Sequence, residues 1–151
     1  MKTTKRFSEA VDKLYIAFHN GQLHPEDCSA CAVGNILDRR DFWKHLSDEH
    51  GSLNLNYIGN FHEIRGKKFN GYSPLELLKI EQTFLKGCGY QLPYNYNNKK
   101  PKNPTNPSVL FKGLCAVIEL LCQFDNIDNI LEYRQLFDVH NMPTKLHEEI
   151  V

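Results

Sequence analysis

The 151-residue sequence lacks a long hydrophobic run, an excess of charge of either sign and a glycine-rich phosphate-binding motif. Lysine and arginine total 18, as do aspartate and glutamate, which argues against nucleic-acid binding because such domains are usually basic. The longest apolar stretch, 109–124, contains Lys112, Glu119 and Gln123, so we expect no membrane span. Hydrophobic residues make up 41% of the chain and aromatic residues 11%, which excludes the composition of a disordered protein.

Length and the character of the N-terminus predict one cytoplasmic domain covering residues 1–151. A single domain commonly holds about 100–200 residues. The segment after Met1 is amphipathic and contains Glu9 and Asp12, whereas a secretory signal would have a continuous apolar run. The odd number of cysteines, five, also argues against a disulfide framework. We therefore expect reduced thiols, as is usual in the cytosol.

Apolar residues at helical spacing predict an all-α fold, a bundle of about six helices. The clearest segments are 4–19, 73–88 and 108–124. The second of these begins with Ser73-Pro-Leu-Glu76, a capping box with proline at the first helical position. The third is apolar almost all round, which predicts a central helix that other helices surround.

Shorter elements are predicted between and after these helices. The shorter predicted helices cover residues 28–37, 42–50, 58–69 and 125–138, with a final turn after Pro143. Alternation of apolar and polar residues predicts one short strand pair near 52–58. Residues 92–107 are rich in proline, asparagine and lysine, which predicts a mobile loop.

The sequence motif with the clearest chemical meaning is the C-x-x-C pair formed by Cys28 and Cys31. Asp27 precedes the pair as the predicted N-cap of a helix, so both thiols are expected in its first turn, where the helix dipole favours thiolates. The spacing lets both sulfurs reach one tetrahedral zinc ion. A redox dithiol and plain packing at the start of the helix remain alternatives for this pair.

One C-x-x-C supplies only half of a zinc site, so further ligands must come from elsewhere in the chain. Cys88 is the predicted third ligand, and His24 or Cys122 is the predicted fourth. Free cysteine also packs as a small hydrophobe, and Cys122 lies in a fully apolar helix where packing is the favoured interpretation. Cys88 continues the apolar face of its own helix, so both interpretations apply to it.

No catalytic constellation is recognised, so we do not expect an enzyme. His45 and Glu49 are one helical turn apart, which is more typical of a solvated helix face than of a metal site. The lysines of the 92–107 loop are more typical of a solvated loop than of a nucleic-acid contact. An unknown protein partner, bound through an exposed face or this loop, stays open.

Three stretches carry a resemblance to a known family: residues 27–35 (DCSACAVGN), 71–89 (GYSPLELLKIEQTFLKGCG) and 111–122 (FKGLCAVIELLC). Together they resemble small bacterial proteins that often carry the name of the flavin- and NADH-binding subunit of the sodium-translocating NADH:quinone reductase. The resemblance implies a redox or iron–sulfur role for Cys28 and Cys31. The chain has no nucleotide-binding motif and no plant-type cysteine run, so we carry no catalytic residue over.

The sequence therefore leaves three functional hypotheses. The first is a small cytosolic helical protein that binds a metal ion, zinc above all. The second is a metal-free helical module that binds another protein. The third is a redox or iron–sulfur accessory protein, as the resemblance implies.

Overall fold

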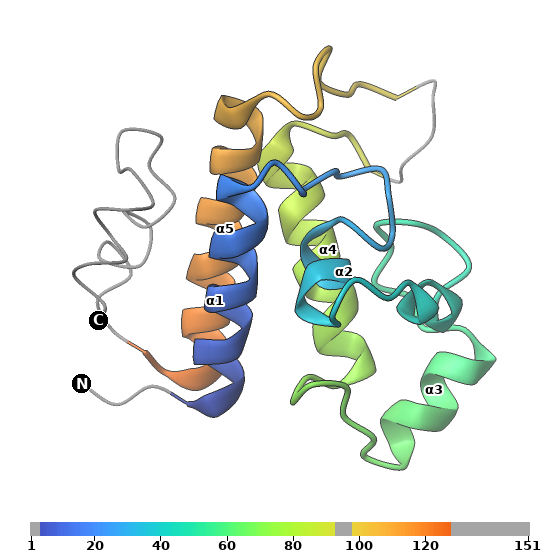
Figure 1. The fold of residues 1–151 in the computed structure, drawn as a ribbon. Coiled ribbons are helices and arrows are strands. Elements are labelled where there is room, and N and C mark those ends of the chain that lie inside the picture. Colours follow the sequence, from blue (N-terminus) through green and yellow to red (C-terminus); the bar gives the residue numbers. More distant parts are fainter. Residues whose placement is uncertain (1–3, 93–97, 128–151) are drawn as a thin grey trace.

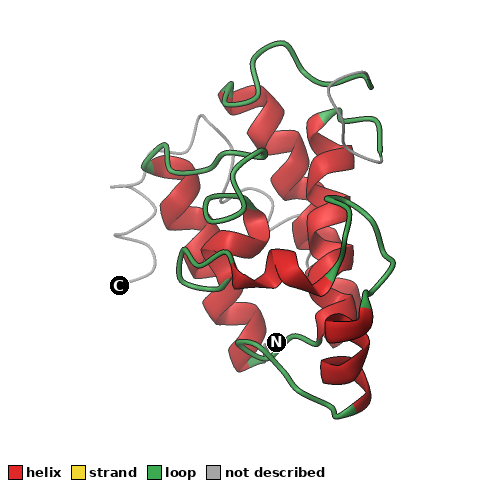
Figure 2. Cartoon of the chain, turned by 90° about the vertical axis from the view of Figure 1, so that its right-hand side faces the viewer, coloured by secondary structure: helices red, strands yellow, loops and turns green. Residues whose placement is uncertain are grey.

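The computed structural model describes residues 4–92 and 98–127, and this part of the chain is all-α, as predicted (Figure 1). Its helices, in chain order, are α1 (Lys5–His19), α2 (Ala32–Ile36), the 3-10 helix η1 (Phe42–Leu46), α3 (Tyr57–Ile64), α4 (Pro74–Cys88) and α5 (Pro107–Asp125). Figure 2 shows helices and loops without a strand in the described residues. In place of the strand pair expected near 52–58, Ser47 and Leu55 form an isolated antiparallel bridge.

The three long helices lie close to their predicted positions because their end signals act locally. The side chain of Thr4 caps α1 by accepting a hydrogen bond from the backbone N–H of Phe7, at 3.2 Å. At the start of α4, Ser73 and Glu76 form the reciprocal capping box that the sequence predicts. Gly89 ends α4 in the left-handed conformation, with φ 102°.

α4 and α5 pack against each other along their length, and two glycines bring them close together (Figure 1). A Cβ added to Gly87 would lie 2.8 Å from the Cα of Gly113. A Cβ added to Gly113 would lie 2.5 Å from the sulfur of Cys88. Because these contacts join the end of α4 to the start of α5, the two helices form an antiparallel pair. α1 also packs against α5.

α5 is long and apolar enough to cross a bilayer by length and composition, but the core helix of a globular fold passes the same test. Its buried residues are Leu110, Gly113, Leu114, Cys115, Val117, Ile118, Leu121 and Cys122. The charged or polar residues Lys112, Glu119 and Gln123 are exposed, as the sequence pattern predicts. This arrangement is that of a helix packed on one side against a protein core.

The shorter helices differ from their predicted bounds. The helix predicted from residue 28 begins only at Ala32, because residues 27–31 form a hydrogen-bonded turn. The helix predicted over 42–50 is a 3-10 helix that ends at Leu46, whose carbonyl accepts a hydrogen bond from the N–H of Asn56 at 2.9 Å.

The helix predicted over 58–69 is α3, which begins and ends earlier than expected. Its end at Ile64 follows from Gly66, which has a φ of 73° and lets the N–H of Lys67 donate to the carbonyl of His62. The helices predicted over 125–138 and after Pro143 lie outside the described residues, apart from Asp125, Asn126 and Ile127 at the end of α5.

Candidate functional site

The C-x-x-C pair lies in a turn that its own neighbours hold in place. The Asp27 carboxylate accepts hydrogen bonds from the backbone N–H and the hydroxyl of Ser29, at 2.9 and 2.8 Å. The Asp27 carbonyl accepts a hydrogen bond from the N–H of Cys31 at 2.8 Å. Asp27 therefore organises the turn before α2 and is not the helix cap that its sequence context predicts.

The thiol of Cys31 takes the place of the predicted aspartate cap. Its sulfur accepts a hydrogen bond from the N–H of Gly34 at 3.3 Å, and the side chain is fully buried. Gly34 is required there, because an added Cβ would lie 2.4 Å from the carbonyl oxygen of Cys28. Cys31 is thus part of the local fold of α2.

The expectation that both thiols lie in the first turn of a helix, where thiolates are favoured, is wrong, because the helix begins only at Ala32 and burial raises the pKa of both thiols. Burial, with a smaller contribution from the negative charge of Glu81, raises the pKa of the Cys31 thiol well above its ordinary value. The same two causes, in the same order, raise the pKa of Cys28, which is only half-buried. Both thiols are therefore protonated at neutral pH, and an approaching metal ion would have to displace the protons.

The residue that sequence reasoning missed is Glu81 of α4, which has no exposed surface. Its Oε2 lies 2.5 Å from Nε2 of His50, and within the described residues its Oε1 has no hydrogen-bond partner. The spacing could have pointed to it, since Glu81 occurs four residues after Leu77 and three before Phe84. A charged residue on that apolar face is a departure from the pattern that its neighbours set.

Glu81 brings together residues from several segments. Burial tends to lower the pKa of His50, but the hydrogen bond and the charge of Glu81 outweigh burial and raise it. Burial, again aided by Glu81, raises the pKa of Cys88 to about 12. The carboxylate thus acts electrostatically on Cys28, Cys31 and Cys88, three of the predicted metal ligands.

A pocket of about 290 Å³ opens beside Cys28 and His50. Its lining residues are Cys28, Trp43, Lys44, His45, Ser47, Asp48, Glu49 and His50. The indole N–H of Trp43 donates to the carbonyl of Cys28 at 2.8 Å, and its ring lies against that of His50. The turn of residues 27–31, named the thiol turn from here on, therefore forms one wall of the pocket together with η1 and the residues that follow η1 up to His50.

Of the remaining predicted ligands, His24 lies beside the turn of residues 27–31, since its N–H donates to the carbonyl of Ala30 at 2.9 Å and its carbonyl accepts from the N–H of Asp27 at 3.2 Å. Nδ1 of His24 accepts a hydrogen bond from the N–H of Glu26 at 3.1 Å, in an exposed loop. Cys122 lies nine residues beyond Gly113 on α5, about 13 Å along the helix at 1.5 Å per residue. The sulfur of Cys88 lies beside Gly113. Cys88 and Cys122 therefore cannot share a zinc ion, whose sulfur ligands lie about 4 Å apart.

Residues 4–92 and 98–127 contain no group of three or more His, Cys, Asp or Glu side chains arranged to hold a metal ion. In this part of the chain Glu81 and His50 form a pair, and the thiols near them do not join it in a ligand set. The predicted set of Cys28, Cys31, Cys88 and a fourth ligand is therefore not preassembled.

A second feature, which the sequence pattern did not indicate, is the outward apolar face of α3. Tyr57 is 86% exposed and Ile64 is 84% exposed, while Ile58 and Phe61 are 50% and 49% exposed. Tyr57, Phe61 and Ile64 recur at steps of four and three, so they lie on one side of the helix. This is a continuous apolar stripe that faces solvent.

The opposite side of α3 packs closely against η1 at Gly59. Gly59 is the buried residue of this helix, and an added Cβ would lie 2.3 Å from the carbonyl oxygen of Leu46. α3 therefore reverses the usual amphipathic arrangement, in which the large apolar residues face the core. In Figure 1 it lies at the periphery of the molecule, away from α1 and α5.

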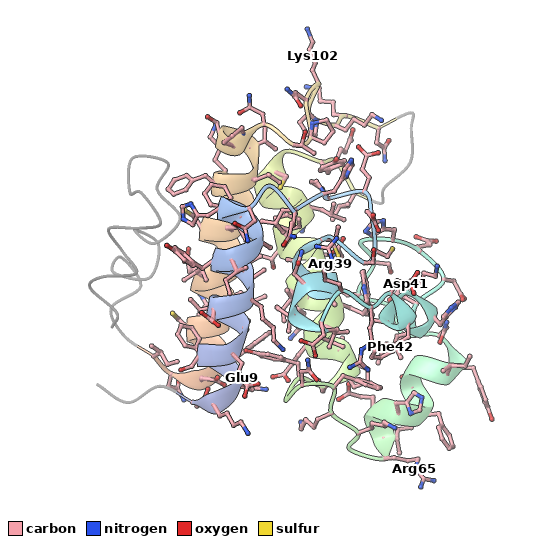
Figure 3. All side chains as sticks on the ribbon, in the orientation of Figure 1. Glu9, Arg39, Asp41, Phe42, Arg65 and Lys102 are labelled. Carbon is pink, nitrogen blue, oxygen red and sulfur yellow. The ribbon has the colours of Figure 1, made fainter. Side chains whose placement is uncertain are left out.

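Charged residues continue the stripe at one end. Arg65, Lys67 and Lys68 follow α3 and are all exposed. The guanidinium of Arg65 lies over the Phe61 ring, 5.1 Å from its centroid, and Figure 3 shows Arg65 pointing away from the protein. The nearby acid, Glu63, is turned inward and accepts a hydrogen bond from the N–H of Leu75 at 2.9 Å.

Comparisons of the chain with protein families, with curated proteins and with solved structures found no match.

Proposed function

We propose that this protein is a helical interaction module that binds another molecule through the apolar face of α3. The observation that carries the proposal is the solvent exposure of Tyr57, Ile58, Phe61 and Ile64 on one eight-residue helix. Burying a large apolar side chain contributes roughly 1.5–3 kcal/mol, and the fold forgoes that contribution at these positions. Contiguous exposed apolar patches of this kind mark interaction sites.

The proposal keeps the predicted cytoplasmic location and the single helical domain. It also keeps the expectation that the protein is not an enzyme. In this scheme α4, η1 and the thiol turn form the base that holds α3 in place, while α3 provides the anchoring side chains at helical spacing, as in other helix-mediated contacts.

The test is to make the stripe polar and to measure stability and binding separately. Ile64→Ser should leave the free energy of unfolding within about 0.5 kcal/mol of the parent, as for other surface substitutions. A photoreactive benzophenone side chain in place of Tyr57 should form a cross-linked adduct in the producing cells, and Ile64→Ser should abolish the adduct. Ile16, exposed by 46% on α1, is the matched control position and should give no adduct. Unfolding of Ile64→Ser, or equal adducts at both positions, would contradict the proposal.

A second candidate is the zinc protein that the C-x-x-C motif predicts, and one observation favours it. Glu81 is fully buried with one oxygen atom that has no hydrogen-bond partner among the described residues, and the thiols of Cys28 and Cys31 lie within its electrostatic reach. Buried polar atoms are normally satisfied, so a bound cation is one way to complete this site. In this version, Glu81 or His50 takes the place of Cys88 and Cys122 as a ligand to zinc.

Elemental analysis of protein purified without chelators tests the zinc candidate. Stoichiometric zinc that is lost in Cys28→Ser and in Glu81→Gln, and retained in the control Cys115→Ser, would support it. A visible absorption band would instead favour the iron–sulfur alternative that the resemblance implies. Protein without metal, with all five thiols intact, would remove both.

A further inference from the structure

Positive charge adjoins the apolar stripe of α3, whereas the negative charge of the same helix lies on its other side. Successive residues of an α-helix are about 100° apart, so Arg65 lies about 40° from Phe61 around the axis and Glu63 about 160° from it. The contacts agree, since the Arg65 guanidinium covers the Phe61 ring and Glu63 accepts a hydrogen bond from the N–H of Leu75. The one acid of α3 is therefore turned away from the side that faces solvent.

Two further cations follow the helix at the same end. Lys67 and Lys68 are exposed, and the ion pairs of the described residues all involve other cations. The acids that precede α3 do not offset this charge, because Asp48 and Glu49 line the pocket beside η1. One end of the stripe therefore carries three positive charges, with Arg65, that the described part of the protein leaves without an acidic partner.

Shape and composition together favour a lipid surface over a protein groove as the occupant. α3 lies at the periphery of the molecule (Figure 1), and Tyr57 and Ile64 project from it almost fully exposed. A protein partner for such a convex face would need a groove of matching shape, whereas a layer of lipid headgroups adapts to it. Helices that lie in a membrane interface combine aromatic and aliphatic residues on one face with arginine and lysine beside it. Tyrosine, which is apolar along its ring and polar at its hydroxyl, also suits the headgroup region.

We propose that the occupant of the α3 face is a membrane surface that contains anionic lipids; this inference rests on the proposed function. In the bound state α3 lies parallel to the membrane, with Phe61 and Ile64 below the headgroups. Arg65, Lys67 and Lys68 then lie against lipid phosphates. The charge complementarity is local, because the chain as a whole has a formal net charge of +0. Binding should therefore require both the apolar stripe and the cations beside it.

The attachment is expected to be peripheral and reversible. α3 has eight residues, far fewer than the about 20 that a helix needs to cross a bilayer. Salt screens the attraction between exposed cations and anionic lipids, so binding should weaken as sodium chloride rises from about 50 mM to about 500 mM.

Co-sedimentation of the full chain with lipid vesicles is the test. The chain should bind vesicles of phosphatidylcholine mixed with phosphatidylglycerol, and it should not sediment with phosphatidylcholine alone. Arg65→Gln should weaken binding to the mixed vesicles roughly fivefold, which is the effect of one cation near an anionic surface. Ile64→Ser should weaken it roughly tenfold or more, because one large aliphatic side chain then no longer enters the lipid.

Two matched variants control for charge and for apolar surface. Lys102→Gln removes an exposed cation that Figure 3 shows at the far end of the molecule from Arg65. Ile16→Ser removes a half-exposed isoleucine from α1. Both should bind the mixed vesicles as strongly as the parent, and circular dichroism should show the helix content of the parent in all four variants.

The outcomes separate this inference from the proposed function. No sedimentation with the mixed vesicles, or equal sedimentation with phosphatidylcholine alone, overturns the anionic membrane as the occupant. Binding in which Arg65→Gln and Ile64→Ser match their controls overturns it too. The benzophenone side chain at Tyr57 then decides between the two failures. An adduct with a protein, lost in Ile64→Ser, would leave the α3 face as a protein-binding surface, and the absence of any adduct would overturn the proposed function as well.

Discussion

A single buried carboxylate organises the polar interior of this protein. Glu81 lies on an otherwise apolar face of α4, and its partner His50 comes from the loop after η1. A buried charge is tolerated only when it is paired, so the Glu81–His50 contact is required by the position of Glu81. The segment around His50 is thereby tied to α4, together with the pocket wall that Trp43 completes.

The Glu81–His50 pair predicts a pH dependence of stability in a defined window. Because the pKa of His50 is raised in the folded protein, its contribution to stability is complete below the unfolded value of about 6.5. That contribution is lost as the pH rises through the folded pKa. Urea unfolding between pH 6 and pH 8 should therefore show a free energy of unfolding that falls with rising pH.

Two variants check the origin of that slope. In His50→Gln and in Glu81→Gln the fall between pH 6 and pH 8 should flatten, since the first lacks the titrating group and the second lacks the charge that raises its pKa. The raised thiol pKa values lower stability only at higher pH, and the lowered carboxylate pKa values act only in acid. A slope that persists in both variants would assign the pH dependence to other groups.

At the scale of whole elements, the sequence predicted the long helices accurately and the short ones poorly. α1, α4 and α5 are 15, 15 and 19 residues long and carry complete caps, so periodicity and end signals agree. α2 and η1 have five residues each, and tertiary hydrogen bonds decide where they begin and end. Asp27 is an N-cap by its sequence context, but its carboxylate bonds to Ser29 instead.

The candidate sites were harder to predict for a related reason. Cys28 and Cys31 are visible as a motif, but the burial that raises their pKa depends on the fold. The sequence predicted a helix over 58–69 that contains Phe61 and Ile64, but the pattern alone does not say which face of that helix the fold covers. Gly59 decides the orientation of α3, since it is the one position of this helix where η1 can approach so closely.

The α4–α5 pair gives a prediction at this scale. Alanine is the better helix former by about 1 kcal/mol, so Gly113→Ala would stabilise an isolated helix. Here the added methyl meets the sulfur of Cys88 at 2.5 Å and the ring of Phe84 at 2.9 Å, which forces the helices apart. We expect a loss of about 1–3 kcal/mol in chemical denaturation.

Lys112→Ala, at the neighbouring exposed position of α5, is the control for this experiment. It changes the same helix without entering the contact with α4, and its free energy of unfolding should stay close to that of the parent. If Gly113→Ala were as stable as this control, the close approach of the two helices at Gly87 and Gly113 would be wrong.

At the scale of the whole molecule, Arg6 joins segments that are far apart in the chain. Its guanidinium donates to both oxygens of Asp125 at the end of α5, to the carbonyl of Gly71 at 2.7 Å, and to Glu76 in the first turn of α4 at 3.0 Å. It also lies over the ring of Tyr72, 4.5 Å from the centroid. The start of α1 is thereby fixed to both helices of the α4–α5 pair.

Removing the guanidinium should therefore destabilise the whole fold and not a single helix. Arg6→Met leaves the carboxylate of Asp125, whose side chain is only 4% exposed, without its main partner, and the loss is expected to be about 3 kcal/mol. Lys5→Met is the matched control, because Lys5 is 91% exposed and its ion pair with Glu9 is long, at 3.9 Å. It should unfold at the same denaturant concentration as the parent.

Acid unfolding supplies the second measurement on the same variants. Burial tends to raise the pKa of Asp125, but its hydrogen bonds from Arg6 and Thr4 outweigh burial and lower it. A lowered carboxylate pKa contributes stability that is present above the unfolded value of about 3.9 and is lost as the pH falls through the folded value. The gap between the parent and Arg6→Met should thus be full at pH 6 and narrow below about pH 4. A gap of equal size at both pH values would mean that Arg6 stabilises the fold by packing on Tyr72 and not through its charge.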